Sequence, residues 1–128
     1  MPEQIVLDSS AVLALLLDEP GGQRIASVLD FAAMSTVNLT EVHARLLKLG
    51  EMPLPAWNRI LALQCEICQF TAGQARMAAE LIQVTQQHGL SLGDRACLAL
   101  AMERKAKVYT ADRLWKNLSL GIEIELIR

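Results

Sequence analysis

The sequence has few aromatic residues, no long hydrophobic run and no excess of positive charge. Aromatic side chains make up 4% of its 128 residues, whereas hydrophobic residues make up 52% and are rich in leucine and alanine. This composition favours helices packed on a small sheet over an all-β sandwich. The formal net charge of -2 argues against a binder of long duplex nucleic acid, which presents a large positive field. A short single-stranded substrate held at a local site remains compatible with it.

Cysteine is also scarce, and the three thiols form no recognisable framework. An odd number of cysteines argues against a disulfide scaffold and for a reducing compartment. Cys65 and Cys68 form a CxxC pair, but they lie in a segment that alternates like a strand, so their side chains should point to opposite faces. Because no second Cys or His pair completes a zinc set, we expect both to be small buried hydrophobic residues.

Segments that would take the chain into or across a membrane are missing. The apolar run at residues 11–17 is far shorter than the ~20 residues that a membrane helix needs. No basic region precedes the first apolar run, as it would in a signal peptide. We find no linker, repeat or low-complexity tract. We therefore expect a single domain over residues 1–128, located in the cytoplasm and without a membrane partner.

Predicted strands and helices alternate along the chain. Strands are expected at residues 4–7, 31–35, 65–70, 107–109 and 122–126, the last of them at the edge of the sheet. Helices are expected at residues 9–17, 23–29, 39–49, 56–63, 71–87, 93–104 and 111–117. Ser9 or Ser10 is available to cap the first helix. This alternation predicts an α/β fold with a largely parallel sheet.

Four acidic residues stand at the openings of predicted helices: Asp8, Glu41, Asp94 and Asp112. Ligands of parallel sheets bind outside the carboxyl ends of the strands. Asp8 ends the first strand, and Glu41 and Asp112 follow shortly after two others, so we expect these three at one edge of the sheet. Asp94 joins them only if its helix begins at the same edge.

Carboxylates gathered in this way need a partner of opposite charge. Two of them ~4 Å apart repel by about 4 kcal/mol at an effective dielectric near 20. A proton, an arginine or a divalent cation could neutralise them. Mg²⁺ or Mn²⁺ prefers oxygen ligands, and such a cation can polarise a phosphodiester and activate a water molecule. The pattern therefore favours a metal-dependent phosphodiesterase, with RNA as the expected substrate.

Each acid also has a purely structural explanation as part of a helix cap. Asp8 could cap the first helix itself. The others have a polar neighbour at a spacing typical of caps: Asn38 with Glu41, Ser91 with Asp94, and Thr110 with Asp112. Capping and metal binding are compatible, because a cap fixes the position of the carboxylate.

Arginines lie beside three of the acids. Arg45 shares a helical face with Glu41, while Arg95 and Arg113 directly follow the other two acids. Two roles remain open for Arg45, Arg95 and Arg113. They could contact RNA phosphates around a metal site, or they could form ordinary ion pairs on helix faces.

Four short blocks contain the acids, in order and with suitable gaps along essentially the whole chain: LDSSA at 7–11, VNLTEV at 37–42, LSLGDRAC at 90–97 and YTADR at 109–113. Together they resemble the blocks of PIN domains, and in particular the VapC-type toxins of bacterial toxin–antitoxin pairs. The resemblance implies a three-layer α/β/α sandwich and a metal-dependent ribonuclease that uses Mg²⁺ or Mn²⁺. It also implies a homodimer and a cognate antitoxin that covers an apolar groove.

Matched by position, the same resemblance assigns roles to individual residues. It implies that the four acids form the catalytic and metal-binding site. Asp8 and Asp94 would be direct ligands, and Glu41 and Asp112 would act directly or through water. Thr110 matches a supporting hydroxyl residue, and Asn38 matches a polar residue near the rim.

Other families with similar length or chemistry fit less well. A phosphoacceptor receiver domain needs an Asp after its middle strand, whereas Thr-Ala-Gly follows residues 65–70 here. A haloacid-dehalogenase-type phosphatase needs D-x-D, and this chain has Asp-Ser-Ser at its first strand. A Rossmann enzyme needs a Gly-rich turn, which is missing. The remaining alternative is a PIN-like binding or regulatory module that has lost catalysis. Its expected mark is a missing acid, and all four are present.

Overall fold

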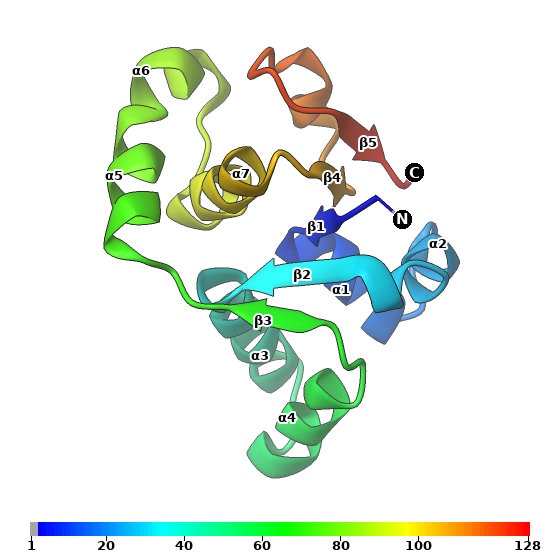
Figure 1. Cartoon of the computed structure of the whole chain (residues 1–128). Helices are drawn as coiled ribbons and strands as arrows, with labels where there is room; N and C mark the ends of the chain where they lie inside the picture. The colour runs from blue at the N-terminus through cyan, green and yellow to red at the C-terminus, as the bar shows by residue number, and fades with distance from the viewer. Residues whose placement is uncertain (1–2) are drawn as a thin grey trace.

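Five parallel strands form one sheet in the computed structural model, which describes residues 3–128 (Figure 1). The strand order is β3-β2-β1-β4-β5. The bounds are Ile5–Leu7 for β1, Ala32–Ser35 for β2, Glu66–Cys68 for β3, Lys107–Thr110 for β4 and Ile124–Leu126 for β5. The expected strands and the parallel sheet are confirmed, and β5 lies at an edge as predicted. Because the chain runs outward from β1 to β3 and then returns to β4, the connections diverge between β1 and β4.

Helices cover both faces of the sheet. The α-helices are α1 Ser9–Leu16, α2 Gly22–Ala26, α3 Thr36–Lys48, α4 Pro53–Leu61, α5 Ala72–Glu80, α6 Ile82–Thr85 and α7 Leu92–Arg104. Short 3-10 turns are η1 Leu29–Phe31, η2 Gln86–His88 and η3 Arg113–Asn117. Within residues 3–128, none of these helices combines the length and apolar character needed to cross a membrane.

Two hydrophobic cores lie on opposite faces of the sheet, which makes the fold a three-layer α/β/α sandwich as expected. Helices α1 to α4 contribute to one core, and α7 and η3 contribute to the other. Successive residues of a strand face opposite sides. Ile5 and Leu7 accordingly belong to the first core and Val6 to the second. Cys65 packs against the first core and Cys68 lies in the second, and both thiols are free, so the expected opposite faces are confirmed. Cys68 is buried as expected, whereas Cys65 is only partly buried.

Helix caps differ in part from the expected ones. Asp8 has an extended backbone and accepts a hydrogen bond from the Ala11 N–H, so the N-cap of α1 is Asp8 and neither serine. Helix α3 begins three residues earlier than predicted because Ser35 caps it. Asn38 and Glu41 therefore lie inside α3 and do not form a capping box.

For the last two helical segments, α7 and η3, one predicted cap is correct and the other is wrong. The capping box of Ser91 and Asp94 is confirmed, with both reciprocal hydrogen bonds present. At η3 the N-cap is Asp112, which accepts a hydrogen bond from the Leu114 N–H, and Thr110 belongs to β4. The carboxylates of Asp94 and Asp112 thus face the starts of their own helical segments.

The predicted helix at residues 71–87 is broken into α5, α6 and η2. Near the break, the buried Thr85 hydroxyl donates a 2.7 Å hydrogen bond to the Leu81 carbonyl. A hydroxyl that bonds back to the preceding turn bends a helix. Thr85 is buried on the same face as Leu81, and a hydrophobic-periodicity pattern does not reveal this polar break in the helix.

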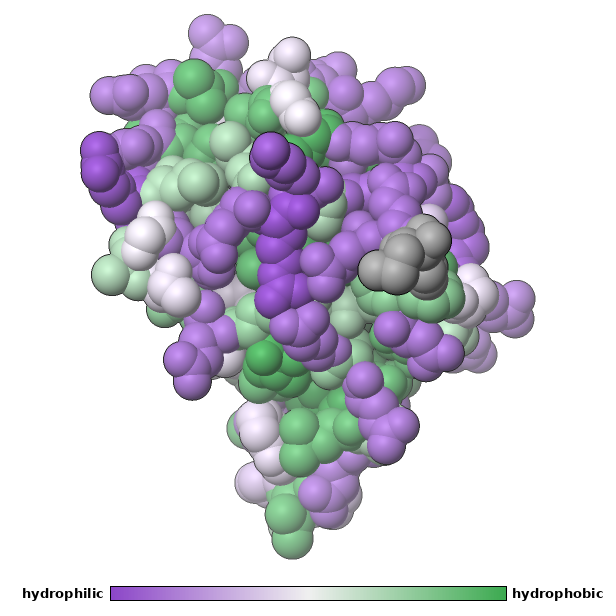
Figure 2. All heavy atoms as spheres, viewed as in Figure 1, coloured by the Kyte–Doolittle hydropathy of each residue, from purple (hydrophilic) through white to green (hydrophobic). Residues whose placement is uncertain are grey.

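Hydrophobic side chains remain exposed around α4. They gather at the end of the molecule that this helix forms, at the bottom of Figure 2. Met52 and Leu54 expose 69% and 67% of their surface, and Leu49 and Leu61 expose nearly half. These residues add an apolar surface on the same side of the sheet as α3.

Candidate active site

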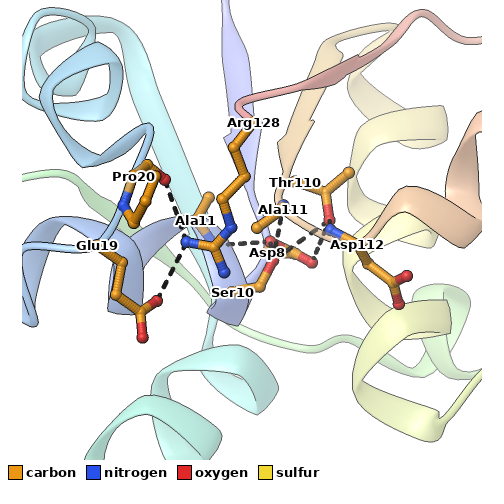
Figure 3. A network of polar contacts seen from close by, with 9 residues as sticks. All are labelled: Asp8, Ser10, Ala11, Glu19, Pro20, Thr110, Ala111, Asp112 and Arg128. Carbon is orange, nitrogen blue, oxygen red and sulfur yellow. Dashed lines mark hydrogen bonds and ion pairs between the residues drawn. The ribbon is translucent and has the colours of Figure 1, made fainter.

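The first acid, Asp8, is buried at the carboxyl end of β1. Only 3% of the residue is exposed. Its Oδ1 accepts hydrogen bonds from Ser10 Oγ at 2.7 Å and from the Ala11 N–H at 2.9 Å, and its Oδ2 accepts one from Thr110 Oγ1 at 2.7 Å (Figure 3). Burial raises the pKa of Asp8 to about 6, the negative charge of Asp94 raises it slightly, and the hydrogen bonds oppose both effects.

Two hydroxyl groups connect Asp8 to the end of β4. Thr110 Oγ1 donates to Asp8 and accepts the backbone N–H of Asp112 at 3.0 Å. Ser10 Oγ donates to Asp8 and accepts the backbone N–H of Ala111 at 2.9 Å. The start of α1 and the end of β4 are therefore held together around Asp8, and the segment that carries Asp112 is placed beside it.

Glu41 approaches from the second turn of α3. Its Oε1 accepts hydrogen bonds from Ser9 Oγ at 2.6 Å and from Asn38 Nδ2 at 3.0 Å. Asn38 is fully buried, and its Nδ2 also donates to the Gly93 carbonyl at 3.1 Å. Asn38 thus links Glu41 to the residue that precedes Asp94.

Helix α7 begins at the same edge of the sheet as the other acids. Gly93 in its first turn touches the Glu41 carboxylate. Burial raises the pKa of Asp94, and the negative charges of Asp112 and Glu41 raise it further. The condition that the sequence left open, that Asp94 reaches the edge occupied by Asp8, is therefore met in the structure.

The buried thiol of Cys97 lies close enough to three of the acids for their negative charges to affect its pKa. Cys97 lies in α7 and is fully buried. Burial raises the pKa of its thiol well above the usual value, and the charges of Asp8, Asp94 and Glu41 raise it further. Residues that are up to 86 positions apart in the sequence thus create one negative field at this edge.

Protein cations do not neutralise this field. Among residues 3–128, the ion pairs of lysine and arginine involve other acids and leave these four carboxylates without one. Arg128 in Figure 3 is bonded to Glu19 and to the Pro20 carbonyl. Arg95 Nη1 donates to the Ala78 carbonyl, which braces α5 against α7 instead of facing the acids.

The two remaining arginines are placed differently. Arg45 and Arg113 are exposed, and within the described part of the chain neither forms an ion pair. The helix-face ion pair between Arg45 and Glu41 that the spacing allows is therefore not formed. These two side chains stay available to a ligand.

The kinds of donor at this edge match a hard divalent cation. Every candidate ligand is an oxygen, the set that Mg²⁺ and Mn²⁺ prefer. The buried Oδ1 of Asn38 has no hydrogen-bond partner among the described residues. The carboxylates are not closed around one point, and no three acidic, histidine or cysteine side chains of residues 3–128 are arranged to hold a metal. Cap hydrogen bonds keep Asp94 and Asp112 turned toward Ser91 and Leu114.

The sequence profile of the PIN domain matches residues 5–119. The chain belongs to the PIN domain family. The match covers all four acids and most of the sheet. A comparison with curated proteins found none that matches this chain.

Solved structures of VapC-type PIN domains share the fold over almost their whole length. Mycobacterium tuberculosis VapC20, described as a sarcin-ricin loop cleaving toxin, is 19% identical with a TM-score of 0.73, over 94% of this chain and 99% of that one. A DNA-bound VapBC complex from Salmonella typhimurium gives 19% identity and a TM-score of 0.68, over 99% and 100%. VapBC-5 from Mycobacterium tuberculosis gives 25% and 0.63, over 99% of both chains. The resemblance that the four blocks predicted is confirmed at the level of the fold.

Sequence reasoning missed three participants in the site. Ser9 and Ser10 were considered only as caps, although each binds a carboxylate through its hydroxyl. Gly93 was included in the block at residues 90–97 but was given no role. The available signal was position, because both serines directly follow Asp8 and the glycine directly precedes Asp94.

Proposed function

We propose that this PIN domain is a metal-dependent endoribonuclease and the toxin of a toxin–antitoxin pair. The convergence of four carboxylates at one edge of the sheet, without a compensating protein cation, carries the proposal. The fold shared with VapC20, a toxin described as cleaving the sarcin-ricin loop, supports RNA as the substrate class. Which RNA it cleaves depends on surfaces beyond the four acids.

The chain's own carboxylates would supply the oxygen ligands that such a cation requires, once the side chains of Asp94 and Asp112 turn away from their caps. In the proposal, Asp8 and Asp94 hold Mg²⁺ or Mn²⁺, while Glu41 and Asp112 act directly or through water. When bound, such a cation would polarise the phosphodiester and lower the pKa of a water molecule. Thr110 and Ser10 orient the Asp8 carboxylate, which must lose its proton to serve as a ligand.

Substrate contacts would come from the exposed arginines. Arg45 lies on α3 together with Glu41, and Arg113 is the first residue of η3, directly after its N-cap Asp112. Guanidinium groups match phosphate oxygens in bidentate fashion. Arg95 is committed to the Ala78 carbonyl, so we propose only a structural role for it.

The apolar surface around α4 is the proposed contact for a protein partner. VapBC-5, one of the solved relatives, is described as a member of the VapBC family of toxin-antitoxin systems. Met52 and Leu54 are too exposed to contribute to the core, and a partner helix could bury them. We extend the proposal to a cognate antitoxin, a homodimer and a cytoplasmic location.

Cleavage of RNA by the purified protein, freed of any antitoxin, tests the function. We expect cleavage with Mg²⁺ or Mn²⁺ and none after EDTA is added. Asp8→Asn and Asp94→Asn should keep the fold and lower the cleavage rate by roughly 100-fold or more, by weakening the proposed metal site. Glu103→Gln, which changes an exposed acid near the other end of α7, is the matched control and should cleave normally.

Two outcomes would overturn the assignment. Normal cleavage by both Asn variants would show that Asp8 and Asp94 are not needed for catalysis. RNA binding without cleavage under any divalent cation would favour the catalytically inactive PIN-like module. In cells, expression of the wild-type chain alone should halt growth, and expression of Asp8→Asn should not.

A further inference from the structure

Gly93 lies where any side chain would collide with Glu41. A Cβ built on this glycine would overlap the Glu41 carboxylate, and its three nearest atoms are Oε2, Cδ and Oε1 of that group. Gly93 is buried in the first turn of α7, whereas Glu41 comes from α3. The backbone of one helix therefore forms the surface on which the carboxylate of the other rests.

The backbone conformation does not explain a glycine at this position. Four other glycines of the described chain have a positive φ, and Gly93 does not. Its place is the second residue of an ordinary α-helix, where glycine is less favourable than alanine. The Glu41 carboxylate is thus the feature of the structure that accounts for the missing side chain.

Two hydrogen-bond donors also fix the position of the Glu41 carboxylate against Gly93. Ser9 Oγ and Asn38 Nδ2 both donate to Glu41 Oε1, while Oε2 is the oxygen nearest to the Cβ position of Gly93. Asn38 Nδ2 also donates a hydrogen bond to the Gly93 carbonyl at 3.1 Å. One buried amide therefore fixes the glycine backbone and the carboxylate relative to each other.

We propose that Gly93 is a positioning residue, whose missing side chain lets the Glu41 carboxylate sit against the start of α7, beside Asp94. Its consequence for catalysis rests on the proposed function, because Glu41 then contributes to a metal site. The steric coupling of Gly93 to Glu41 does not rest on that function. A side chain at position 93 would displace a carboxylate at the end of a flexible chain, so the fold should survive the change.

A double-mutant cycle separates this role from a general effect on the helix. Gly93→Ala is made in the wild type and in Glu41→Ala. Gly73→Ala is the matched control, since Gly73 is likewise the second residue of a helix, α5, and its Cβ would meet only Thr71 Oγ1 at 3.9 Å. The measurements are the Tm, the Kd of Mn²⁺ alone, and the RNA cleavage rate.

Helix propensity alone should raise the Tm by about 1–3 °C in Gly73→Ala and in Gly93→Ala made on Glu41→Ala. On the wild type, we expect Gly93→Ala to give no such gain, because the new methyl group displaces Glu41. In the wild-type background, Gly93→Ala should also raise the Kd of Mn²⁺ and lower the cleavage rate, each by about 10-fold. In the Glu41→Ala background, the same substitution should change the Kd of Mn²⁺ by less than about 2-fold. Gly73→Ala should leave the Kd and the rate unchanged.

Equal effects of Gly93→Ala in the two backgrounds would overturn the proposal, as would behaviour identical to that of Gly73→Ala. If the wild type neither binds Mn²⁺ nor cleaves RNA, the proposed function fails on its own. The Tm cycle still decides whether Gly93 and Glu41 are sterically coupled.

Discussion

Asp8 Oδ2 accepts a 2.7 Å hydrogen bond from Thr110 Oγ1, across 102 positions of sequence. The same hydroxyl accepts the backbone N–H of Asp112 at 3.0 Å. One buried side chain thereby orients one acid of the candidate site and places the backbone of a second.

Thr110→Val should show how much depends on that hydroxyl. Valine has nearly the same volume, so the change leaves the buried Asp8 oxygen and the Asp112 N–H without their partner. We expect the free energy of unfolding to fall by about 1–3 kcal/mol. The pKa of Asp8 should rise further, because this hydrogen bond lowers it. Urea denaturation and NMR titration measure the two effects.

Thr110→Ser is the control for that variant, because it keeps the hydroxyl and loses only a methyl group. It should retain most of the stability at pH 7 and the pKa of Asp8. Equal behaviour of the Val and Ser variants would mean that the hydroxyl does not orient Asp8.

In the metal-free protein, the raised pKa of Asp8 should make the free energy of unfolding depend on pH. Its pKa rises from 3.8 in the unfolded chain to about 6 in the folded one, mainly through burial. Between these values the folded state holds more protons, so this contribution falls as the pH rises through the window and is constant above it. Burial shifts the pKa of Asp94 in the same direction, whereas Glu66 beside Arg104 has its pKa lowered to about 2 and acts oppositely.

Asp8→Asn isolates this contribution. The variant cannot ionise, so in EDTA its stability relative to the wild type should increase from pH 4 to pH 6 and then level off. The full shift corresponds to about 3 kcal/mol, an upper bound for the gain. Denaturation curves of both proteins across pH 4–8 measure the difference. A difference that does not change with pH would contradict the raised pKa.

Divalent cations should stabilise the folded chain. A ligand that binds only the native state adds about 2.7 kcal/mol at 100 times its Kd. We expect Mn²⁺ to raise the Tm of the wild type, and to do so more at pH 7.5 than at pH 5, because a protonated Asp8 is a poor ligand. Asp94→Asn should lose most of the effect, and Glu103→Gln should keep it. The same Mn²⁺ shift in Asp94→Asn would place the cation elsewhere.

The sequence was sufficient to predict the parallel sheet with its helices and the position of three of the acids at one edge of that sheet. Each strand except the last, β5, reads as an apolar or alternating segment before a helix, and strand ends that precede helices in a parallel sheet meet at one edge. That rule correctly places Asp8 at this edge together with Glu41 and Asp112. It could not place Asp94, because α7 follows a loop and no strand directly precedes it.

Contacts between distant residues account for what the sequence did not reveal. Asn38 and Glu41 have capping-box spacing, yet both lie inside α3, and the Asn38 amide donates to Glu41 and also to Gly93, 55 positions away. Arg95 follows Asp94 in the sequence but turns to the Ala78 carbonyl. In both cases a local pattern has two physical solutions, and tertiary packing selects between them.

The four carboxylates lie at positions 8, 41, 94 and 112, on segments that only the finished sheet brings together. A chain still emerging from the ribosome can bring Asp8 and Glu41 together through α1 and α3, but Asp112 joins them only when β4 has docked beside β1. If the chain is the proposed nuclease, its activity would therefore appear only after the segment that carries Asp112 has been made and has folded onto the sheet.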